Sequence, residues 1–185
     1  LALTANGTLD ESYGELGYAR LGASEDASVT CMSMTPQRDG RLLVAGTEGG
    51  AAFVARLMSG GEVDTGFDAG EVAEVMMEAR AIAVGGDDGI IVAGSGPSGA
   101  SVARVNTDGT LDDRFGMAGT TWIDMPNDGD AFAVANDVAI LAGGEVLVAG
   151  GFGSRAFVAR LLGSDGIDGP GVLGIVRTGS GVTEG

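Results

Sequence analysis

The chain has 185 residues, of which 44% are hydrophobic and 35 are glycine, and its formal net charge at pH 7 is −16. All ten basic residues are arginine, because the sequence contains neither histidine nor lysine. An acidic surface repels phosphate backbones and anionic headgroups, which argues against nucleic-acid and anionic-lipid partners. No apolar run reaches the roughly 18 residues that a membrane-spanning helix requires, so we expect no membrane span.

Residues 1–16 resemble the end of a repeat unit together with the connection that follows it. Leu3 precedes Asp10 by the same spacing that separates Leu57 from Asp64. The chain opens on Leu1 and shows no signal-peptide pattern, so we expect an excerpt of a longer protein or a processed product.

Three internal repeats follow, and we place their boundaries at residues 17–58, 59–105 and 106–162. Each ends on a Val-Ala-Arg segment, and the arginines recur at a period of roughly 50 residues, which is typical of a repeat architecture. Short runs of Val, Ile, Leu and Ala between glycine-rich turns predict four strands in each repeat. The predicted strands cover 17–22, 28–35, 41–46 and 51–58, then 71–76, 79–85, 90–95 and 100–105, then 119–125, 136–142, 145–150 and 155–162.

Two segments of these repeats need further interpretation. The Glu, Ala and Met content of residues 71–84 would also support a helix, but alignment with the neighbouring repeats favours strands. Cys31 lies in the predicted strand 28–35, where we expect a small buried hydrophobe rather than a reactive thiol.

The aromatic residues Tyr13, Phe67 and Phe115 each stand ahead of a glycine, and we predict that they fill the core between units.

The third repeat and the C-terminal segment depart from this regular pattern. An insertion at residues 125–130 either carries binding specificity or is a neutral extension of a loop. Residues 163–185 contain a further predicted strand at 175–177, which starts another blade or closes a ring. The chain therefore begins on a last strand and ends on a first strand, as a ring does when its two ends complete one sheet.

A repeated arginine precedes a repeated aspartate by eight positions in every unit. The side chain of the last strand can reach back to the turn that follows it, so this spacing predicts one structural ion pair per unit. A catalytic role would require a unique site, and the threefold occurrence argues against one. The predicted pairs are Arg56 with Asp64, Arg104 with Asp112, and Arg160 with Asp168.

The sequence lacks most groups that carry enzyme chemistry. Without histidine there is no common general base and no partner for a nucleophilic serine, and without lysine there is no Schiff base. Carboxylates are abundant, so an acid pair of the glycosidase kind stays open, although nothing singles out one pair. Residues 106–113 carry oxygen atoms of the kind that calcium prefers, but they do not fit the EF-hand template. We expect no cofactor and no catalytic residue, with calcium as the alternative.

The residues that carry a family resemblance are 39–46, 53–57 and 108–112, with Phe115 and Gly119 behind them. Together they resemble the delta-60 repeat, a β-propeller repeat of bacterial, mostly exported or surface-associated proteins. The resemblance covers nearly the whole chain. It implies an all-β fold, namely a propeller-like array of four-stranded antiparallel blades with three complete units and partial units at both ends. It also implies a secreted or cell-surface setting, and it brings no catalytic motif.

These features predict a non-enzymatic binding or scaffold module that engages a protein or glycan partner through its blade loops. An alternative is a subunit of an extracellular ring or fibre that assembles from copies of the chain. A weaker alternative is a carboxylate-based enzyme acting on glycans. Closed propellers contain about four to eight blades, so three units would require further blades in the same polypeptide or other copies.

Overall fold

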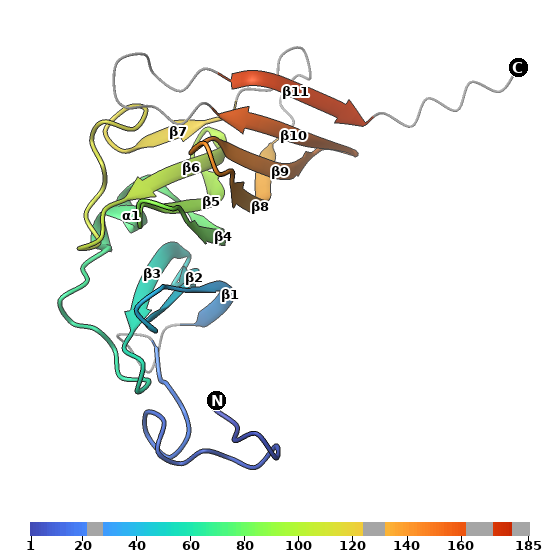
Figure 1. Ribbon diagram of the computed structural model, residues 1–185. Coiled ribbons are helices and arrows are strands. Elements are labelled where there is room, and N and C mark those ends of the chain that lie inside the picture. The colour runs from blue at the N-terminus through green and yellow to red at the C-terminus, as the bar shows by residue number, and fades with distance from the viewer. Residues whose placement is uncertain (22–27, 124–131, 162–171, 179–185) are drawn as a thin grey trace, which may run out of the picture.

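The computed structural model describes residues 1–21, 28–123, 132–161 and 172–178, the last of these as backbone only. Its strands form three antiparallel sheets that lie one above another (Figure 1). Sheet 1 contains β1–β3, sheet 2 contains β4–β7 and sheet 3 contains β8–β11, each in chain order. The predicted all-β fold class is confirmed. The elements are β1 (Val29–Pro36), β2 (Leu42–Glu48), β3 (Ala51–Leu57), α1 (Gly70–Val75), β4 (Glu78–Val84), β5 (Ile90–Gly96), β6 (Gly99–Val105), β7 (Thr120–Trp122), β8 (Ala133–Ile140), β9 (Val146–Phe152), β10 (Arg155–Leu161) and β11 (Val172–Thr178).

The sheets are offset by one strand from the sequence repeats. Strand β7 lies in the predicted first strand of the third repeat, yet it pairs with β6 of the second repeat. Likewise β11, which contains the predicted strand 175–177, pairs with β10 and completes sheet 3. Sheets 2 and 3 therefore each combine three strands of one repeat with the first strand of the next. The grouping of four strands within one repeat was wrong, because the connection after the last strand folds back onto that same strand.

Helix α1 replaces the strand that was predicted at residues 71–76. Its Val72 has no exposed surface and Met76, which follows it, is 2% exposed, so the helix buries its apolar residues against sheets 1 and 2. The helix-favouring composition wins here, and sheet 1 is left with three strands. Within the described parts of the chain, no helix is long and apolar enough to cross a membrane.

Residues 17–21, predicted as part of a strand, form none. Residues 14–17, at the start of this segment, repeat the backbone conformation that precedes β7. Gly14, Leu16 and Gly17 have positive φ angles, and so do the equivalent residues Gly116, Ala118 and Gly119. Strand β7 pairs with residues 101–103 of β6, and the positions equivalent to these lie at or before Leu1. Among the described residues, this segment pairs with no strand.

Strand register gives every sheet two equivalent faces. We call the front face the side that carries Val44, Val92 or Val148, and the back face the side that carries Ala45, Ala93 or Ala149. The front faces comprise Met34, Leu42, Val44, Phe53 and Ala55 in sheet 1, Ile82, Ile90, Val92, Ser101 and Ala103 in sheet 2, and Val138, Val146, Val148, Phe157 and Ala159 in sheet 3. The back faces comprise Leu43, Ala45, Ala52 and Val54, then Ile91, Ala93, Ala100 and Val102, then Leu147, Ala149, Ala156 and Val158.

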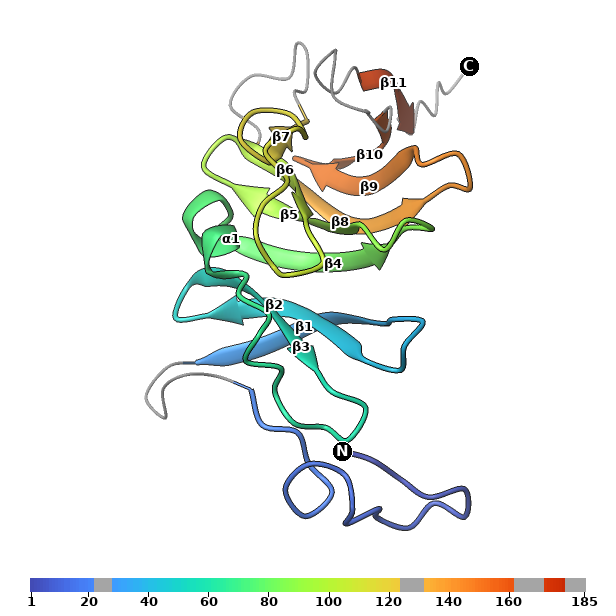
Figure 2. The ribbon, with the colours of Figure 1, turned by 60° about the vertical axis from the view of Figure 1, so that its left-hand side comes forward.

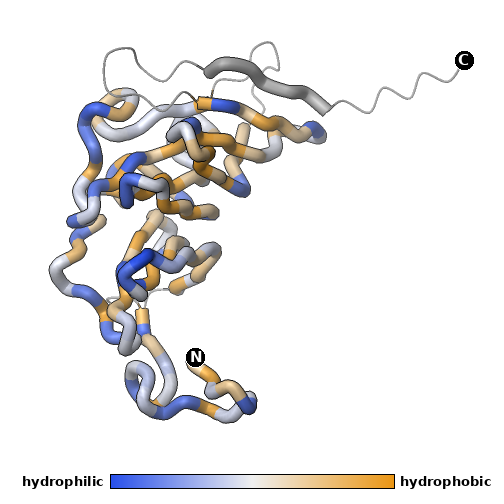
Figure 3. The backbone as a smooth tube through the Cα atoms, in the orientation of Figure 1, coloured by the Kyte–Doolittle hydropathy of each residue, from blue (hydrophilic) through white to orange (hydrophobic). Residues whose placement is uncertain are grey.

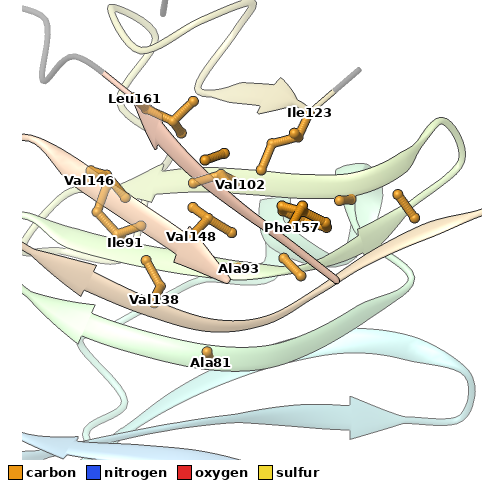
Figure 4. Close-up of a cluster of buried hydrophobic side chains, with 14 of the residues drawn as sticks. Ala81, Ile91, Ala93, Val102, Ile123, Val138, Val146, Val148, Phe157 and Leu161 are labelled. Atoms are coloured by element: carbon orange, nitrogen blue, oxygen red, sulfur yellow. The ribbon is translucent and has the colours of Figure 1, made fainter. Parts of the chain in front are cut away.

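The core lies between these faces. The back face of sheet 1 packs on the front face of sheet 2, and the back face of sheet 2 packs on the front face of sheet 3 (Figure 4). Apolar residues accordingly run along the strands while hydrophilic ones gather in the turns (Figure 3). Sheet 2 is thus buried on both sides, which is the burial that stacked repeats rely on. Phe67 and Phe115 lie in the two clusters, as predicted for the aromatic residues of the connections, whereas Tyr13 is half-buried.

A glycine faces a β-bulge at the same place in each sheet. The bulges fall after Cys31, Ala79 and Ala135, and the residues opposite them are Gly46, Gly94 and Gly150. A methyl group on Gly94 would lie 1.9 Å from the carbonyl oxygen of Glu78, closer than any real contact. The recurring Val-Ala-Gly sequence is therefore explained by the approach of two backbones.

Cys31 is exposed, so the expectation of a buried side chain was wrong. It lies on β1, an edge strand of sheet 1, and no sheet among the described residues covers the front face beside it. An apolar run of this kind predicts burial for a strand that lies between two sheets. Strand β1 does not lie between two sheets.

Candidate functional site

The first predicted ion pair, between Arg56 and Asp64, is present and nearly buried. Arg56 leaves the end of β3, and both its Nε and Nη2 lie 2.7 Å from Asp64 Oδ2. Its Nη1 donates to the carbonyl oxygen of Thr107 in the next connection, and its guanidinium stacks 4.5 Å above the ring of Phe67. The side chain therefore joins two successive connections between sheets.

The second predicted pair shares its members with other partners. Arg104 Nε lies 3.4 Å from Asp112 Oδ2, while its Nη2 lies 2.8 Å from Asp87 Oδ2 in the β4–β5 turn. Asp112 in turn accepts a bond of 2.9 Å from Arg114 Nε. The structure brings Arg104 and Asp112 together, but it divides the charge of each between two contacts.

The third repeated arginine has a different acidic partner within the described residues. Arg160 Nη2 lies 2.6 Å from Glu145 Oε1, at the end of the β8–β9 turn. The predicted partner Asp168 lies outside the described residues, as does the insertion at 125–130.

The partners of the three repeated arginines differ because one position at the end of each hairpin turn carries a different residue. The backbone bonds that close the turns make Arg41, Gly89 and Glu145 equivalent. In the first turn, Arg41 pairs with Asp39 and also approaches Asp64. In the second, Gly89 leaves space that Arg104 enters. In the third, Glu145 pairs directly with Arg160. Sequence reasoning missed Asp87 and Glu145 because it compared only the arginine with the aspartate after it. Aligning the hairpin turns would have found both.

The arginines hold the paired aspartates in their ionised form. Hydrogen bonding from Arg56 lowers the pKa of Asp64 below its usual value, and bonding from Arg114 does the same for the pKa of Asp112. A general acid needs the opposite shift, so neither carboxyl is prepared to donate a proton near neutral pH.

A cleft opens between sheets 2 and 3, beside these charges. Figure 2 shows that the β1–β2, β4–β5 and β8–β9 turns project on the same side of the stack. The cleft lies between the last two turns and has a volume of about 640 Å³. Both charged and apolar residues line the cleft. They include Asp87, Arg104, Asp112, Arg114, Phe115 and Leu141.

Glycines make room for this cleft. Gly85, Gly86 and Gly89 line one wall, and Gly143 and Gly144 line the other. At the boundary between sheets 1 and 2, the position equivalent to Gly86 is Arg38, whose Nη1 reaches across to the carbonyl oxygen of Gly86 at 3.0 Å. The same architecture is therefore bridged by a long side chain at one boundary and left open at the next.

The calcium alternative concerned residues 106–113. There Asp108 Oδ1 accepts bonds from the backbone N–H and hydroxyl of Thr110, and the carbonyl of Thr107 accepts from Arg56. Across the described segments, no group of three or more acidic or cysteine side chains is arranged to hold a metal ion.

Comparison with known families places this geometry in a wider context. Residues 37–67 and 82–115 match the model of a family described as "Domain of unknown function (DUF5122) beta-propeller". Two repeats of the chain are similar to a β-propeller repeat family. Both matches end on the aromatic residue of a connection, Phe67 or Phe115, so they identify the same repeat that the strand register shows. No curated protein matches the chain at a significant level.

The lowered pKa of Asp64 makes the stability of the fold depend on pH. A carboxyl whose pKa is lower in the folded than in the unfolded state stabilises the fold at pH values above its unfolded pKa. This stabilisation is lost as the pH falls through its folded pKa. We expect Asp64→Asn to be less stable than wild type at pH 7, and the difference to shrink below about pH 4. Urea titrations of both proteins from pH 7 to pH 3 measure the gap. A gap that stays constant over that range would show that the Asp64 charge contributes nothing.

Proposed function

We propose that the chain is a non-enzymatic propeller module of the delta-60 type, from a bacterial secreted or surface protein, that binds a protein or glycan. The observation that carries this proposal is the cleft between the β4–β5 and β8–β9 turns. Ligand sites are concave, with apolar walls and a few placed polar groups, and the cleft has both. The secreted or surface setting rests on the resemblance of the repeats.

Binding suits the cleft better than catalysis does. Arg104 and Arg114 occupy the carboxylates of Asp87 and Asp112 with ion pairs. A glycosidase needs one carboxylic acid that stays protonated, and the lowered pKa of Asp112 opposes this role. The same arginines and the exposed rim around Leu141 offer donors and an apolar contact to a glycan or a protein loop.

Refilling the cleft tests the binding proposal. Gly86→Arg copies the residue found at the equivalent position of the β1–β2 turn, and a Cβ atom added at Gly86 would have only the end of Arg38 nearby, 3.9 Å away. We expect this variant to fold normally and to lose at least tenfold in affinity for its partner. The probes are an array of bacterial and host glycans and a panel of extracellular proteins, with titration calorimetry of each binder found.

Gly86→Ala is the matched control, because it removes the glycine but leaves the cleft open, and its binding should match that of wild type. Circular dichroism checks the fold of both variants. The proposal fails when neither panel yields a binder, or when the affinity of every binder survives Gly86→Arg.

A second candidate function is a subunit of a self-assembling ring or fibre. The observation that favours it is that the front face of sheet 1 and the back face of sheet 3 are apolar and lack a covering sheet among the described residues. Further blades in one polypeptide or other copies of the chain would supply that cover.

A further inference from the structure

The charged side chains that line the cleft are matched in pairs. Arg104 Nη2 lies 2.8 Å from Asp87 Oδ2, and Arg114 Nε lies 2.9 Å from Asp112 Oδ1. Among the described residues, these two cations and two anions are the charged groups of the lining, so their charges sum to zero. A charged ligand would find no unpaired group of opposite sign. It would have to displace one member of a pair and leave the other without its partner, which is costly.

The hydrogen-bonding capacity that is left over suits hydroxyl groups. A guanidinium has five N–H donors, and each carboxylate oxygen has two lone pairs. Among the described residues, no hydrogen bond involves Nη1 of Arg104 or of Arg114, and the side chain of Asp87 is 64% exposed. The pair of Arg104 and Asp87 therefore places a donor beside an acceptor. Two neighbouring hydroxyls of a sugar can accept from the first and donate to the second.

The apolar residues of the lining offer a ligand little surface. Ile91, Phe115 and Val146 are 4%, 1% and 2% exposed, and only Leu141 at the rim reaches 39%. Protein partners are commonly anchored by a large aromatic or aliphatic side chain that fills an apolar pocket. The lining has no apolar surface of that size, whereas the exposed part of Leu141 suffices for the C–H groups of a sugar ring.

We propose that the cleft binds an uncharged oligosaccharide and that Arg114 contacts it. This inference rests on the proposed binding function and specifies the class of ligand. The cleft volume of about 640 Å³ lies within the range of roughly 300–1,000 Å³ that is typical of small-ligand sites. The net charge of −16 acts in the same direction as the matched pairs, because it repels acidic oligosaccharides.

Arg114 distinguishes this cleft from the boundary between sheets 1 and 2. It follows Asp112 by two positions, as Gly66 follows Asp64, so the first boundary has no side chain at this place. The side chain of Arg114 is 77% exposed, and among the described residues its guanidinium contacts Asp112 alone. An exposed ion pair of this kind contributes little to stability, so Arg114 can be replaced without loss of the fold.

Binding of defined oligosaccharides to the full chain tests the inference. The uncharged probes are oligomers of glucose, galactose, mannose and N-acetylglucosamine, the acidic probe is oligogalacturonate and the basic probe is a chitosan oligomer. We expect at least one uncharged probe to bind in titration calorimetry, and the charged probes to bind at least tenfold more weakly. The affinity for the uncharged probe should change less than about threefold between about 0.1 M and 1 M NaCl, over which the screening length falls from ~10 Å to ~3 Å.

Two variants place that binding in the cleft. Arg114→Ala and Gly86→Arg should each weaken it at least tenfold, the first by removing a contact and the second by filling the space. Arg20→Ala is the matched control for the first, because Arg20 is an exposed arginine that pairs with Glu15 outside the cleft. Gly86→Ala is the control for the second. Both controls should bind as wild type does, and circular dichroism checks the fold of every variant.

Each other outcome counts against the inference in a distinguishable way. A binder that Gly86→Arg abolishes, but that is acidic, basic or a protein, overturns the uncharged ligand and leaves the proposed function intact. Binding of an uncharged probe that Gly86→Arg abolishes and Arg114→Ala does not change overturns the role of Arg114. The absence of any binder among sugars and proteins, or binding that survives Gly86→Arg, overturns the inference together with the proposed function.

Discussion

Gly94→Ala is expected to lower the free energy of unfolding by about 3 kcal/mol, at the upper end of what overpacking costs. The added methyl group would lie 1.9 Å from the carbonyl oxygen of Glu78 and 2.9 Å from its carbonyl carbon, both backbone atoms of the neighbouring strand. Strand β4 can make room only by moving away from β5, and sheet 2 is held on both faces by other sheets. Urea denaturation at neutral pH measures the change.

Gly86→Ala serves as the reference for this experiment, because its methyl group would meet only the end of Arg38, 3.9 Å away. Both substitutions change the entropy of the unfolded chain in the same way, so the difference between them reports the contact in the folded state. Equal midpoints for the two variants would show that the bulge at β4 yields without cost.

Arg56→Ala is expected to lower the free energy of unfolding by roughly 2 kcal/mol, since hydrogen bonds to charged groups contribute about 1.5–3 kcal/mol when removed. The side chain is 6% exposed and contacts Asp64, the carbonyl of Thr107 and the ring of Phe67. Truncation would leave Asp64 with the longer contact to Arg41, at 3.4 Å, and the bond from the backbone N–H of Gly66, at 3.0 Å. Thermal and urea unfolding both measure the loss.

Two further arginines set the scale for Arg56. Arg20→Ala should change stability little, because Arg20 and its partner Glu15 are 81% and 70% exposed. Arg104→Ala should fall between the two, because Arg104 is partly exposed and Asp112 keeps Arg114 as a partner. If Arg56→Ala were as stable as Arg20→Ala, the repeated ion pair would have no structural role.

The candidate site shows where reasoning from sequence reached its limit. The spacing of Arg56 and Asp64 predicted their contact, because strand and turn alone determine how far the side chain reaches. Spacing could not predict that Arg104 would divide its charge with Asp87. That contact lies beside Gly89, where an added Cβ atom would come within 3.3 Å of Arg104 Nη2. The cleft depends on a glycine, Gly86, at the position where the β1–β2 turn has Arg38. The walls of the cleft belong to two turns that come together only in the folded chain.

Helix α1 shows the converse case, in which a local signal was set aside for a global one. Residues 70–75 have helix-forming composition, and alignment with the other repeats suggested a strand. The helix forms because Val72 is buried in the core between sheets 1 and 2 without any backbone pairing.

The sequence by itself determined the repeat, the all-β class, the turns and the recurring arginine, because these depend on spacing along the chain and on the backbone preferences of glycine. Only the tertiary structure decided which strand belongs to which sheet, which face of each sheet is covered, and where the cleft opens. Those features depend on contacts between residues far apart in sequence, and a sheet takes its place from its neighbours rather than from its own residues. The exposed Cys31 illustrates this, because its strand has an apolar sequence and no sheet in the described part of the chain covers the front face beside it.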